Sequence, residues 1–331
     1  MNPLADLLVG ETRCASVWRS RLNGAVGGPA TSLSRIMARL IWPRRLKHMR
    51  YLAPGITLSR HADGRWGIHA EGVLVAESKP LERLVARPAV PVSIVATGPS
   101  ALDYPWDSVR KGERFIIAVN GAPTMLRDLG IRPDLLIVTD REFALTGARH
   151  LAAAPDVPLV IEFLAAAALA VTEPQHLCGR RFAVAERVNL WHGIPSFDAE
   201  RLRTLNDLSG MPFVFPGQKD PKCRVGWSYR PELGIFSGRT VVFGALQIAI
   251  GLGATELEII GMDLSGAGRA YSEGSEQRPT QLQQHYQSFI LPSFQTMRQA
   301  LAGSNIVVTN CSPVCPLPQE LFAALPGQSN E

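Results

Sequence analysis

Small polar residues follow a short apolar run near residue 92, and together they could bind a phosphate group. The run Val92–Ala96 is rich in β-branched residues, which is typical of a buried strand. The turn Thr97–Ser100 follows it directly. Gly98 allows a sharp turn and a close ligand, Pro99 suits the first turn of a helix, and Ser100 adds a hydroxyl group. Such a turn binds nucleotides in α/β folds, although an ordinary strand-to-helix turn has the same sequence features.

Similar polar residues follow other apolar runs along the chain. We expect five further strands, namely Phe115–Val119, Leu135–Val138, Pro158–Ile161, Leu257–Ile260 and Ile306–Val308. Their spacing leaves room for crossovers and predicts a mostly parallel sheet with helices on both faces. In such a sheet the C-terminal strand ends form the ligand crevice. We therefore expect one site to gather the polar residues at these ends, namely Gly98, Ser100, Asn120, Asp140, Asp263 and Asn310.

A second candidate anion site lies where a buried helix is expected to begin. The segment Val241–Leu252 is apolar nearly all round, as expected for a helix buried on every side. Ser237 precedes it as a plausible N-cap and is followed by Gly238. Because a helix N-terminus carries partial positive charge, this pair is suited to attract an anion.

The region between residues 190 and 232 has many turn signals and little periodicity. It holds aromatic and basic residues, namely Trp191, His192, Lys219, Lys222, Arg224, Trp227, Tyr229 and Arg230. Such residues on loops suit a polar, anionic acceptor such as a sugar, and a solvated connection accounts for each of them equally well. We expect His150, His176 and His192 to lie on the surface.

The first 50 residues carry the basic character of the chain. The formal net charge of the 331 residues is +5, but residues 1–50 hold nine arginine and lysine residues against two acidic ones. Apolar residues there recur on one helical face, at Leu33, Ile36, Met37, Leu40 and Ile41. A basic amphipathic helix suits an anionic membrane surface, although a helix docked on its own domain has the same pattern. No nucleic-acid motif accompanies the charge, so we expect no nucleic-acid partner.

The sequence divides into two parts. Residues 1–90 are expected to form the basic helix and a small antiparallel sheet, because Ile56–Ser59 and Trp66–His69 flank Asp63-Gly64, a hairpin signal. Val73–Val75 would add a third strand, and residues 79–91 are expected to form a linker. Residues 91–331 are expected to form the nucleotide-binding domain.

Composition excludes several other classes of protein. The chain is 46% hydrophobic and 19% charged, and no apolar run approaches the ~20 residues that a membrane span needs. Asp6 and Glu11 argue against a signal peptide. The five cysteines are scattered and include no Cys-x-x-Cys pair, which argues against a zinc site and favours free thiols in a reducing cytoplasm.

Four segments occur in a distinctive order. They are Ala96–Ser100, then Val119–Gly121, then Ser237-Gly238 opening a buried helix that leads into Ile260–Asp263, then Tyr271 and His285. In this order, over about residues 92–315, they resemble the bacterial sialyltransferases of glycosyltransferase family forty-two and related Kdo transferases of lipopolysaccharide core assembly. The family usually has an asparagine where this chain has Thr97. The resemblance implies one Rossmann-like domain with a lid near residues 265–290.

The resemblance also implies a role for each matched residue. Two would be catalytic: Tyr271 would donate to the leaving phosphate, and His285 would be the general base for the acceptor hydroxyl. The others would bind the donor, a CMP-activated keto-acid sugar. Gly98, Pro99 and Ser100 would line the phosphate, Asn120 would bond the cytidine or ribose, and Ser237 and Gly238 would hold the sugar carboxylate. Asp140 and Asp263, which follow strands, complete the expected binding set.

The chemistry of a CMP-ulosonic acid suits these residue types. The donor loses CMP through an oxocarbenium-like state, so the protein must stabilise a departing phosphate and activate a hydroxyl. Histidine near its ordinary pKa suits the second task. No Asp-x-Asp occurs in the chain, so we expect no metal and no cofactor beyond the donor. We expect inversion by direct displacement, with a glycolipid or lipopolysaccharide-core acceptor at the cytoplasmic face of the bacterial inner membrane.

Three other functions stay open at this point. The same glycine turn resembles pterin pyrophosphokinase-like domains, although a P-loop Gly-Lys-Ser/Thr is absent. A dehydrogenase is disfavoured, because Gly251-x-Gly253 and Gly266-x-Gly268 lack the third glycine and a preceding strand. A non-catalytic sugar-nucleotide-binding module would have the same turn, and only turnover separates it from an enzyme.

Overall fold

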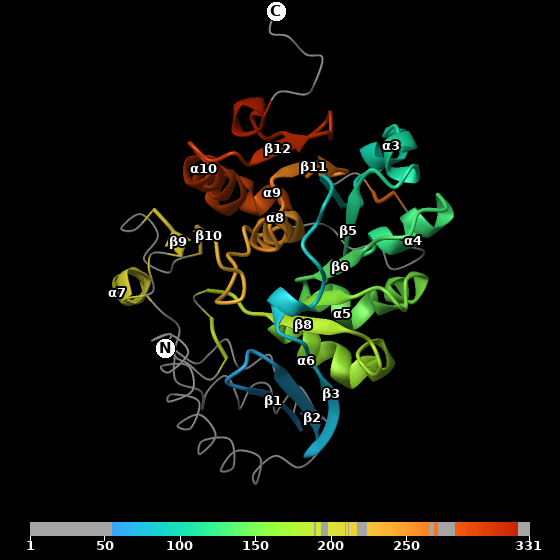
Figure 1. Cartoon of the computed structure of the whole chain (residues 1–331), viewed down its shortest axis with the longest axis vertical. Coiled ribbons are helices and arrows are strands. Elements are labelled where there is room, and N and C mark those ends of the chain that lie inside the picture. Colours follow the sequence, from blue (N-terminus) through green and yellow to red (C-terminus); the bar gives the residue numbers. More distant parts are fainter. Residues whose placement is uncertain are drawn as a thin grey trace, which may run out of the picture.

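A seven-stranded parallel sheet forms the centre of the molecule. The computed structural model describes residues 55–188, 190–192, 198–208, 210, 212–216, 224–264, 268–270 and 282–323. Within them, the large sheet has the order β12-β11-β4-β5-β6-β7-β8 (Figure 1). Its strands are β4 (Val92–Val95), β5 (Phe115–Val119), β6 (Leu135–Val138), β7 (Leu159–Glu162), β8 (Phe182–Ala185), β11 (Glu256–Ile260) and β12 (Val307–Asn310). The expected N-terminal basic helix lies outside the described residues.

Helices cover both faces of this sheet, because its strands bury side chains on both sides. In β5, Ile116 and Ala118 join one core cluster, whereas Ile117 and Val119 join the other. The first face is covered by α3 (Asp107–Arg110), α4 (Ala122–Asp128), α5 (Arg141–Thr146) and α6 (Phe163–Thr172). The second is covered by α7 (Ala199–Leu208), α8 (Val241–Gly251) and α10 (Leu291–Ala300). This is a Rossmann-like α/β fold, as the strand pattern predicted.

Short helical turns complete the described elements. The 3₁₀ helices are Leu81–Arg83, Pro99–Asp103, Ala148–Ala153, Pro174–His176 and Gln319–Leu321. The short helix α9 (Leu282–His285) continues through a π-helical turn, Tyr286–Ile290, into α10. Pro292 at the start of α10 has no N–H to donate, which is consistent with an irregular hydrogen-bond ladder just before it.

The strand order reverses between β4 and β11. Strands β5 to β8 follow β4 on one side, and β11 and β12 lie on its other side. At such a reversal the two connections leave toward opposite faces, and a crevice opens outside the C-terminal strand ends. Figure 1 shows α8 and α10 on one side of the sheet and α4 and α5 on the other. The residues after β4 and β11 therefore border the crevice.

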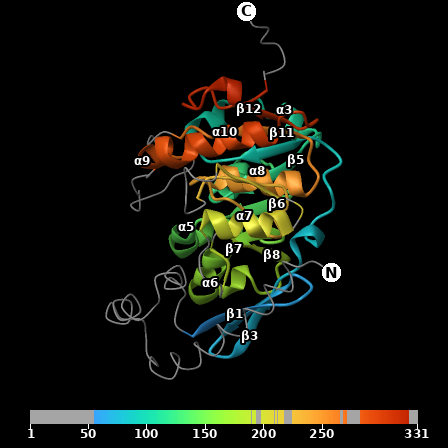
Figure 2. The same ribbon diagram turned by 90° about the vertical axis from the view of Figure 1, so that its left-hand side faces the viewer.

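A small antiparallel sheet lies at the β8 end of the large one (Figure 2). It consists of β1 (Ile56–Arg60), β2 (Trp66–Ala70) and β3 (Val73–Glu77), which confirms the expected hairpin. β1 and β2 pack against α6. The segment expected to be a linker is also packed, because Leu81 and Leu84 are buried in the main core.

Some elements and burial states differ from the sequence predictions. β8 and the two-stranded sheet of β9 (Phe213–Val214) and β10 (Trp227–Ser228) were not expected. The three histidines expected on the surface are all buried. His150 accepts or donates one hydrogen bond with Thr124 at 2.8 Å, and His192 packs 4.3 Å from the Phe163 ring. Within the described part of the chain, no helix is long and apolar enough to cross a bilayer.

Candidate functional site

The turn after β4 is held by a carboxylate from the other side of the crevice. Asp263, which follows β11 and is 2% exposed, accepts a hydrogen bond from the Ser100 backbone N–H at 2.9 Å. The Ser100 hydroxyl donates to the other oxygen of the same carboxylate.

Pro99 stands at the first position of the 3₁₀ helix, as expected. Gly98 has an ordinary φ of −66°, so a sharp turn is not the reason for glycine here. A Cβ on Gly98 would lie 2.5 Å from the Asp263 carboxyl carbon and the Gly261 carbonyl oxygen.

The end of β12 joins this arrangement. The backbone N–H of Met262 donates to the Ser312 hydroxyl at 2.7 Å, and the Ser312 N–H donates to Asn310 Oδ1 at 3.1 Å. Asn310 is 2% exposed. Its amide therefore shapes the loop beside Asp263 from inside the protein, so three of the six polar residues expected to gather, Ser100, Asp263 and Asn310, lie close together.

Asn120 ends β5 in a left-handed conformation. Its φ is 48°, which non-glycine residues adopt rarely and asparagine more readily than most. Its N–H donates to the Ile137 carbonyl at 3.0 Å, whereas its buried Oδ1 has no hydrogen-bond partner among the described residues. A buried amide oxygen without a partner is costly, so it is a natural acceptor for a ligand donor group.

The next two strand ends hold acidic residues that cap helices. Asp140 accepts from the Glu142 N–H at 2.9 Å at the start of α5. Glu162 caps α6 in the same way, accepting from Leu164 at 2.9 Å. Burial raises the pKa of Glu162, and Arg187, whose Nε lies 3.3 Å from it, opposes that change. No group of three His, Cys, Asp or Glu side chains suited to a metal occurs in the described ranges.

The start of α8 reaches the same edge of the sheet. The helix begins at Val241 with Thr240 as its N-cap, so the prediction that Ser237 caps it is wrong. A turn intervenes, in which the Thr240 N–H donates to the Ser237 carbonyl at 3.1 Å. Gly238 has a φ of 51°, and a Cβ there would lie 2.5 Å from the Phe243 ring.

Two contacts show where this turn lies. Ile235, two residues before Ser237, pairs with Arg187 just beyond the end of β8. A Cβ on Gly244, in the first turn of α8, would lie 3.4 Å from the methyl group of Thr139, which follows β6. Ser237 and Gly238 are therefore at the carboxyl edge, on the same side of the molecule as Asn120 and Asp140.

His285 lies beside the segment that leads into α8. Its ring is 5.6 Å from the Phe289 ring, and the Arg239 guanidinium lies 5.2 Å from the centre of that same ring. Burial, and then the positive charge of Arg239, lower the pKa of His285 below its ordinary value. The imidazole is therefore biased toward the neutral form, which can accept a proton. The Tyr286 hydroxyl donates to the Pro316 carbonyl at 2.6 Å and ties this helix to the loop after β12.

Tyr271 lies outside the described residues, as does most of the expected lid. The residues before it are attached to the first turn. The Ala270 N–H donates to the Thr97 carbonyl at 2.8 Å, and Arg269 Nη1 donates to the Thr97 hydroxyl at 3.5 Å. The role expected for Tyr271 stays a prediction.

Several residues at this edge were not predicted from the sequence. They are Glu162, Arg187, Arg239 and Phe289. Glu162 comes directly after the expected strand Pro158–Ile161, which is the one expected strand without small polar residues at its end. Arg239 comes directly after Ser237-Gly238. Those two positions carried a sequence signal, whereas Arg187 and Phe289 become neighbours of the site only in three dimensions.

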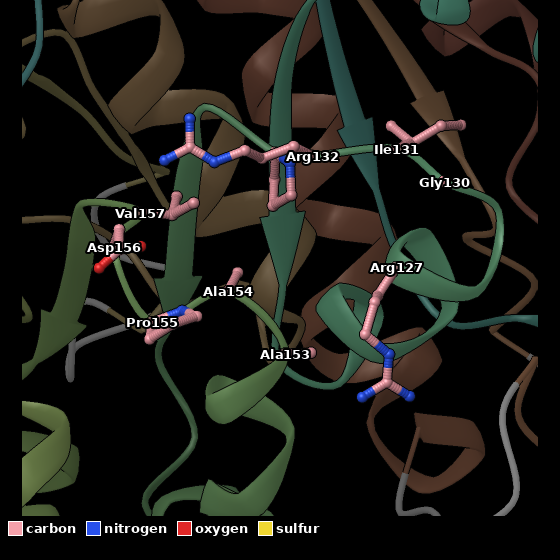
Figure 3. A pocket seen from close by; sticks show the side chains of 10 residues that line it. Arg127, Gly130, Ile131, Arg132, Ala153, Ala154, Pro155, Asp156 and Val157 are labelled. Carbon is pink, nitrogen blue, oxygen red and sulfur yellow. The ribbon is translucent and has the colours of Figure 1, made fainter.

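A cavity at the opposite edge of the sheet does not belong to this site. It has a volume of about 270 Å³ and is lined by residues 130–133 and 153–157 together with Arg127 (Figure 3). These segments precede β6 and β7, so the cavity lies at the amino ends of the strands. Ligand crevices of open parallel sheets form at the carboxyl ends.

Fold and site together define a Rossmann-like α/β protein with polar and basic groups at the carboxyl edge of its sheet. No family model and no curated protein sequence matches the chain. Among solved structures, it is similar to the MAf glycosyltransferase from Magnetospirillum magneticum AMB-1, with 17% identity, 70% of this chain covered and a TM-score of 0.39. The match covers 34% of that protein, so this chain spans about a third of its length.

Two sialyltransferase structures are also similar to the chain. The sialyltransferase CST-II in complex with a trisaccharide acceptor and CMP has 12% identity, covers 71% of this chain and 88% of that one, and has a TM-score of 0.35. CstII from Campylobacter jejuni in complex with CMP-3FNeuAc has 10% identity, covers 71% and 89%, and has a TM-score of 0.34. Identities and TM-scores this low do not assign an activity.

Proposed function

We propose that this protein is an inverting, metal-independent glycosyltransferase. It transfers a 3-deoxy-ulosonic acid, Kdo or sialic acid, from its CMP-activated form to a glycolipid or lipopolysaccharide-core acceptor. The observation that carries the proposal is the position of His285. Its ring lies near Arg239, which directly follows Ser237-Gly238 in the chain, and its pKa is below its ordinary value.

The donor has two anionic groups and one weak bond to break. In this proposal its phosphate lies at the Thr97–Ser100 turn, and its carboxylate lies at Ser237-Gly238 near the N-terminus of α8. The unpartnered Oδ1 of Asn120 accepts a hydrogen bond from the cytidine amine or a ribose hydroxyl. Tyr271 donates to the departing phosphate, and the anchoring of Ala270 to Thr97 supports this role.

The acceptor hydroxyl must lose its proton as the new bond forms. His285 takes that proton as the general base, because a neutral imidazole is abundant at neutral pH when its pKa is lowered. Direct attack on the face opposite to CMP gives inversion at the anomeric carbon. The basic N-terminal segment supports peripheral contact with anionic lipid near a lipid-linked acceptor, at the cytoplasmic face of the inner membrane.

The test is release of CMP from defined donors. Purified protein is incubated with CMP-Kdo or CMP-sialic acid, with and without a lipopolysaccharide-core oligosaccharide. We expect acceptor-dependent CMP release with one donor, unaffected by a chelator. No turnover with any CMP-ulosonic acid, or turnover that needs ATP and Mg²⁺, would contradict the proposal.

A further inference from the structure

Two arginine side chains lie over one phenylalanine ring beside His285, and a third arginine lies close enough to affect the charge of one of them. Arg187 follows β8, Arg224 precedes β10, and Arg239 lies just before α8. The guanidinium carbons of Arg224 and Arg239 lie 4.6 and 5.2 Å from the centre of the Phe289 ring. The negative face of the aromatic ring attracts each cation. Phe289 therefore holds two like charges close together.

Arg187 and Arg239 differ in the negative charge around them. Arg187 contacts Glu162 at 3.3 Å and donates to the Thr139 carbonyl at 3.4 Å. Across the described ranges, by contrast, no carboxylate lies within ion-pair distance of Arg239. Burial, and then the charges of Arg187 and Arg224, lower the pKa of Arg239. These neighbours therefore disfavour the charged form of Arg239, and an anion bound beside it would favour that form.

The backbone at Arg239 is also in an uncommon conformation. Its φ is 58°, in the left-handed region that glycine adopts far more readily than arginine. A non-glycine residue held there is strained, and such residues concentrate at binding and active sites. The nearby N-terminus of α8, a helix of 11 residues, adds partial positive charge. Conformation and charge thus independently indicate a ligand at this position.

The geometry points to an anion on the acceptor. The inference rests on the proposed function, in which the two anionic groups of the donor lie at Thr97–Ser100 and Ser237-Gly238. Neither of these groups is bound by the two arginines over Phe289. In that function the acceptor gives its hydroxyl proton to His285, so side chains close to the His285 ring are close to the acceptor. We infer that Arg224 and Arg239, with Arg187 behind them, bind a phosphate or carboxylate group of the acceptor, close to the hydroxyl that is glycosylated. Guanidinium groups bind both anions through paired N–H donors.

Inorganic phosphate is the first probe, because it needs no turnover. Binding is followed by ³¹P NMR titration of the full chain, with and without saturating CMP. We expect phosphate to bind with the same affinity in both cases, because the acceptor anion and CMP occupy different places. Displacement of phosphate by CMP would assign the cluster to the donor phosphate and overturn the inference, as would the absence of phosphate binding.

Variants then test the residues. Arg239→Gly suits the left-handed backbone, and Arg224→Ala removes the second cation. We expect each to weaken phosphate binding by about tenfold, the loss of one charge-assisted contact, and to leave the CMP affinity within about twofold. Arg298→Ala, an exposed arginine on α10, is the matched control and should change neither. Unchanged phosphate binding in both cluster variants would overturn the inference.

Acceptor kinetics distinguish the two sources of the anion and separate this inference from the proposed function. Three acceptors that differ only in a neutral, phosphorylated or carboxylated group are compared. We expect Arg239→Gly to raise the KM of one anionic acceptor and not that of the neutral one. Equal KM values for all three in the wild type would contradict the inference while leaving glycosyl transfer intact. Absence of CMP release from every donor would instead contradict the proposed function.

Discussion

The carboxylate of Asp263 accepts hydrogen bonds from both the backbone N–H and the side-chain hydroxyl of Ser100. These two hydrogen bonds join the turn after β4 to the loop after β11 through a buried acidic group. It also explains why residue 98 is glycine, since a Cβ there would collide with the same carboxylate. A donor phosphate at this turn must therefore share the Ser100 donors with Asp263 or displace it.

Removing the Asp263 carboxylate should destabilise the fold. Asp263→Ala leaves the partly buried N–H of Ser100 without its acceptor, and we expect the free energy of unfolding to fall by about 1–2 kcal/mol. Asp263→Asn keeps one acceptor oxygen and should cost about half as much. Urea unfolding measures both, with the exposed Asp103→Ala as control. A loss in Asp263→Ala no larger than in the control would show that the two hydrogen bonds contribute little.

Loss of His285 should remove turnover and spare donor binding. For His285→Ala we expect kcat to fall by about 10²–10⁴-fold, the usual contribution of a general base. The affinity for CMP, measured by calorimetry, should stay unchanged, because the imidazole acts on the acceptor. Gln284→Ala, at the preceding exposed position, is the control. Full activity in His285→Ala would remove this residue from the mechanism, whereas weakened CMP binding would place it on the donor side.

The charge of Arg239 should contribute to the position of the acid limb of the pH profile. A base must be deprotonated, so kcat should rise with pH until it passes the pKa of His285 and then level off. Burial and Arg239 lower this pKa from its ordinary value of 6.5. Arg239→Gly removes the cation and part of the burial, so the pKa rises and the acid limb moves to higher pH. NMR titration of the His285 ring checks the direction, and a shift toward lower pH would refute this electrostatic coupling.

Glu162 should make stability decrease with rising pH. Burial raises its pKa in the folded protein above 4.5, the ordinary value. The folded state then holds the proton more tightly than the unfolded chain, so the free energy of unfolding falls as pH rises from about 4.5 through the folded-state pKa. Glu162→Gln has no proton to release and keeps an oxygen that can cap α6. We expect a shallower decrease in urea-unfolding free energy for this variant, and an identical slope would contradict the assignment.

Much of the fold could be predicted because parallel strands buried on both faces are short, continuous apolar runs. The six expected strands of the large sheet all form, and the Asp63-Gly64 signal marks the observed hairpin. β8 was missed because Phe182–Ala185 is short and half alanine, which has weak strand preference. The burial of His150 and His192 was missed because their partners, Thr124 and Phe163, are 26 and 29 positions away in the chain.

The sequence by itself determined which residues end the strands, and therefore that Ser100, Asn120, Asp140, Asp263 and Asn310 lie along one edge of the sheet. Parallel strands place all their carboxyl ends together, so local patterns were sufficient for this. Only the tertiary structure decided that Asp263 bonds to Ser100, and that Arg187, Arg224 and Arg239 lie close to one another beside His285. These residues come from separate loops and helices with no shared period, so their charges become neighbours only when the chain is packed.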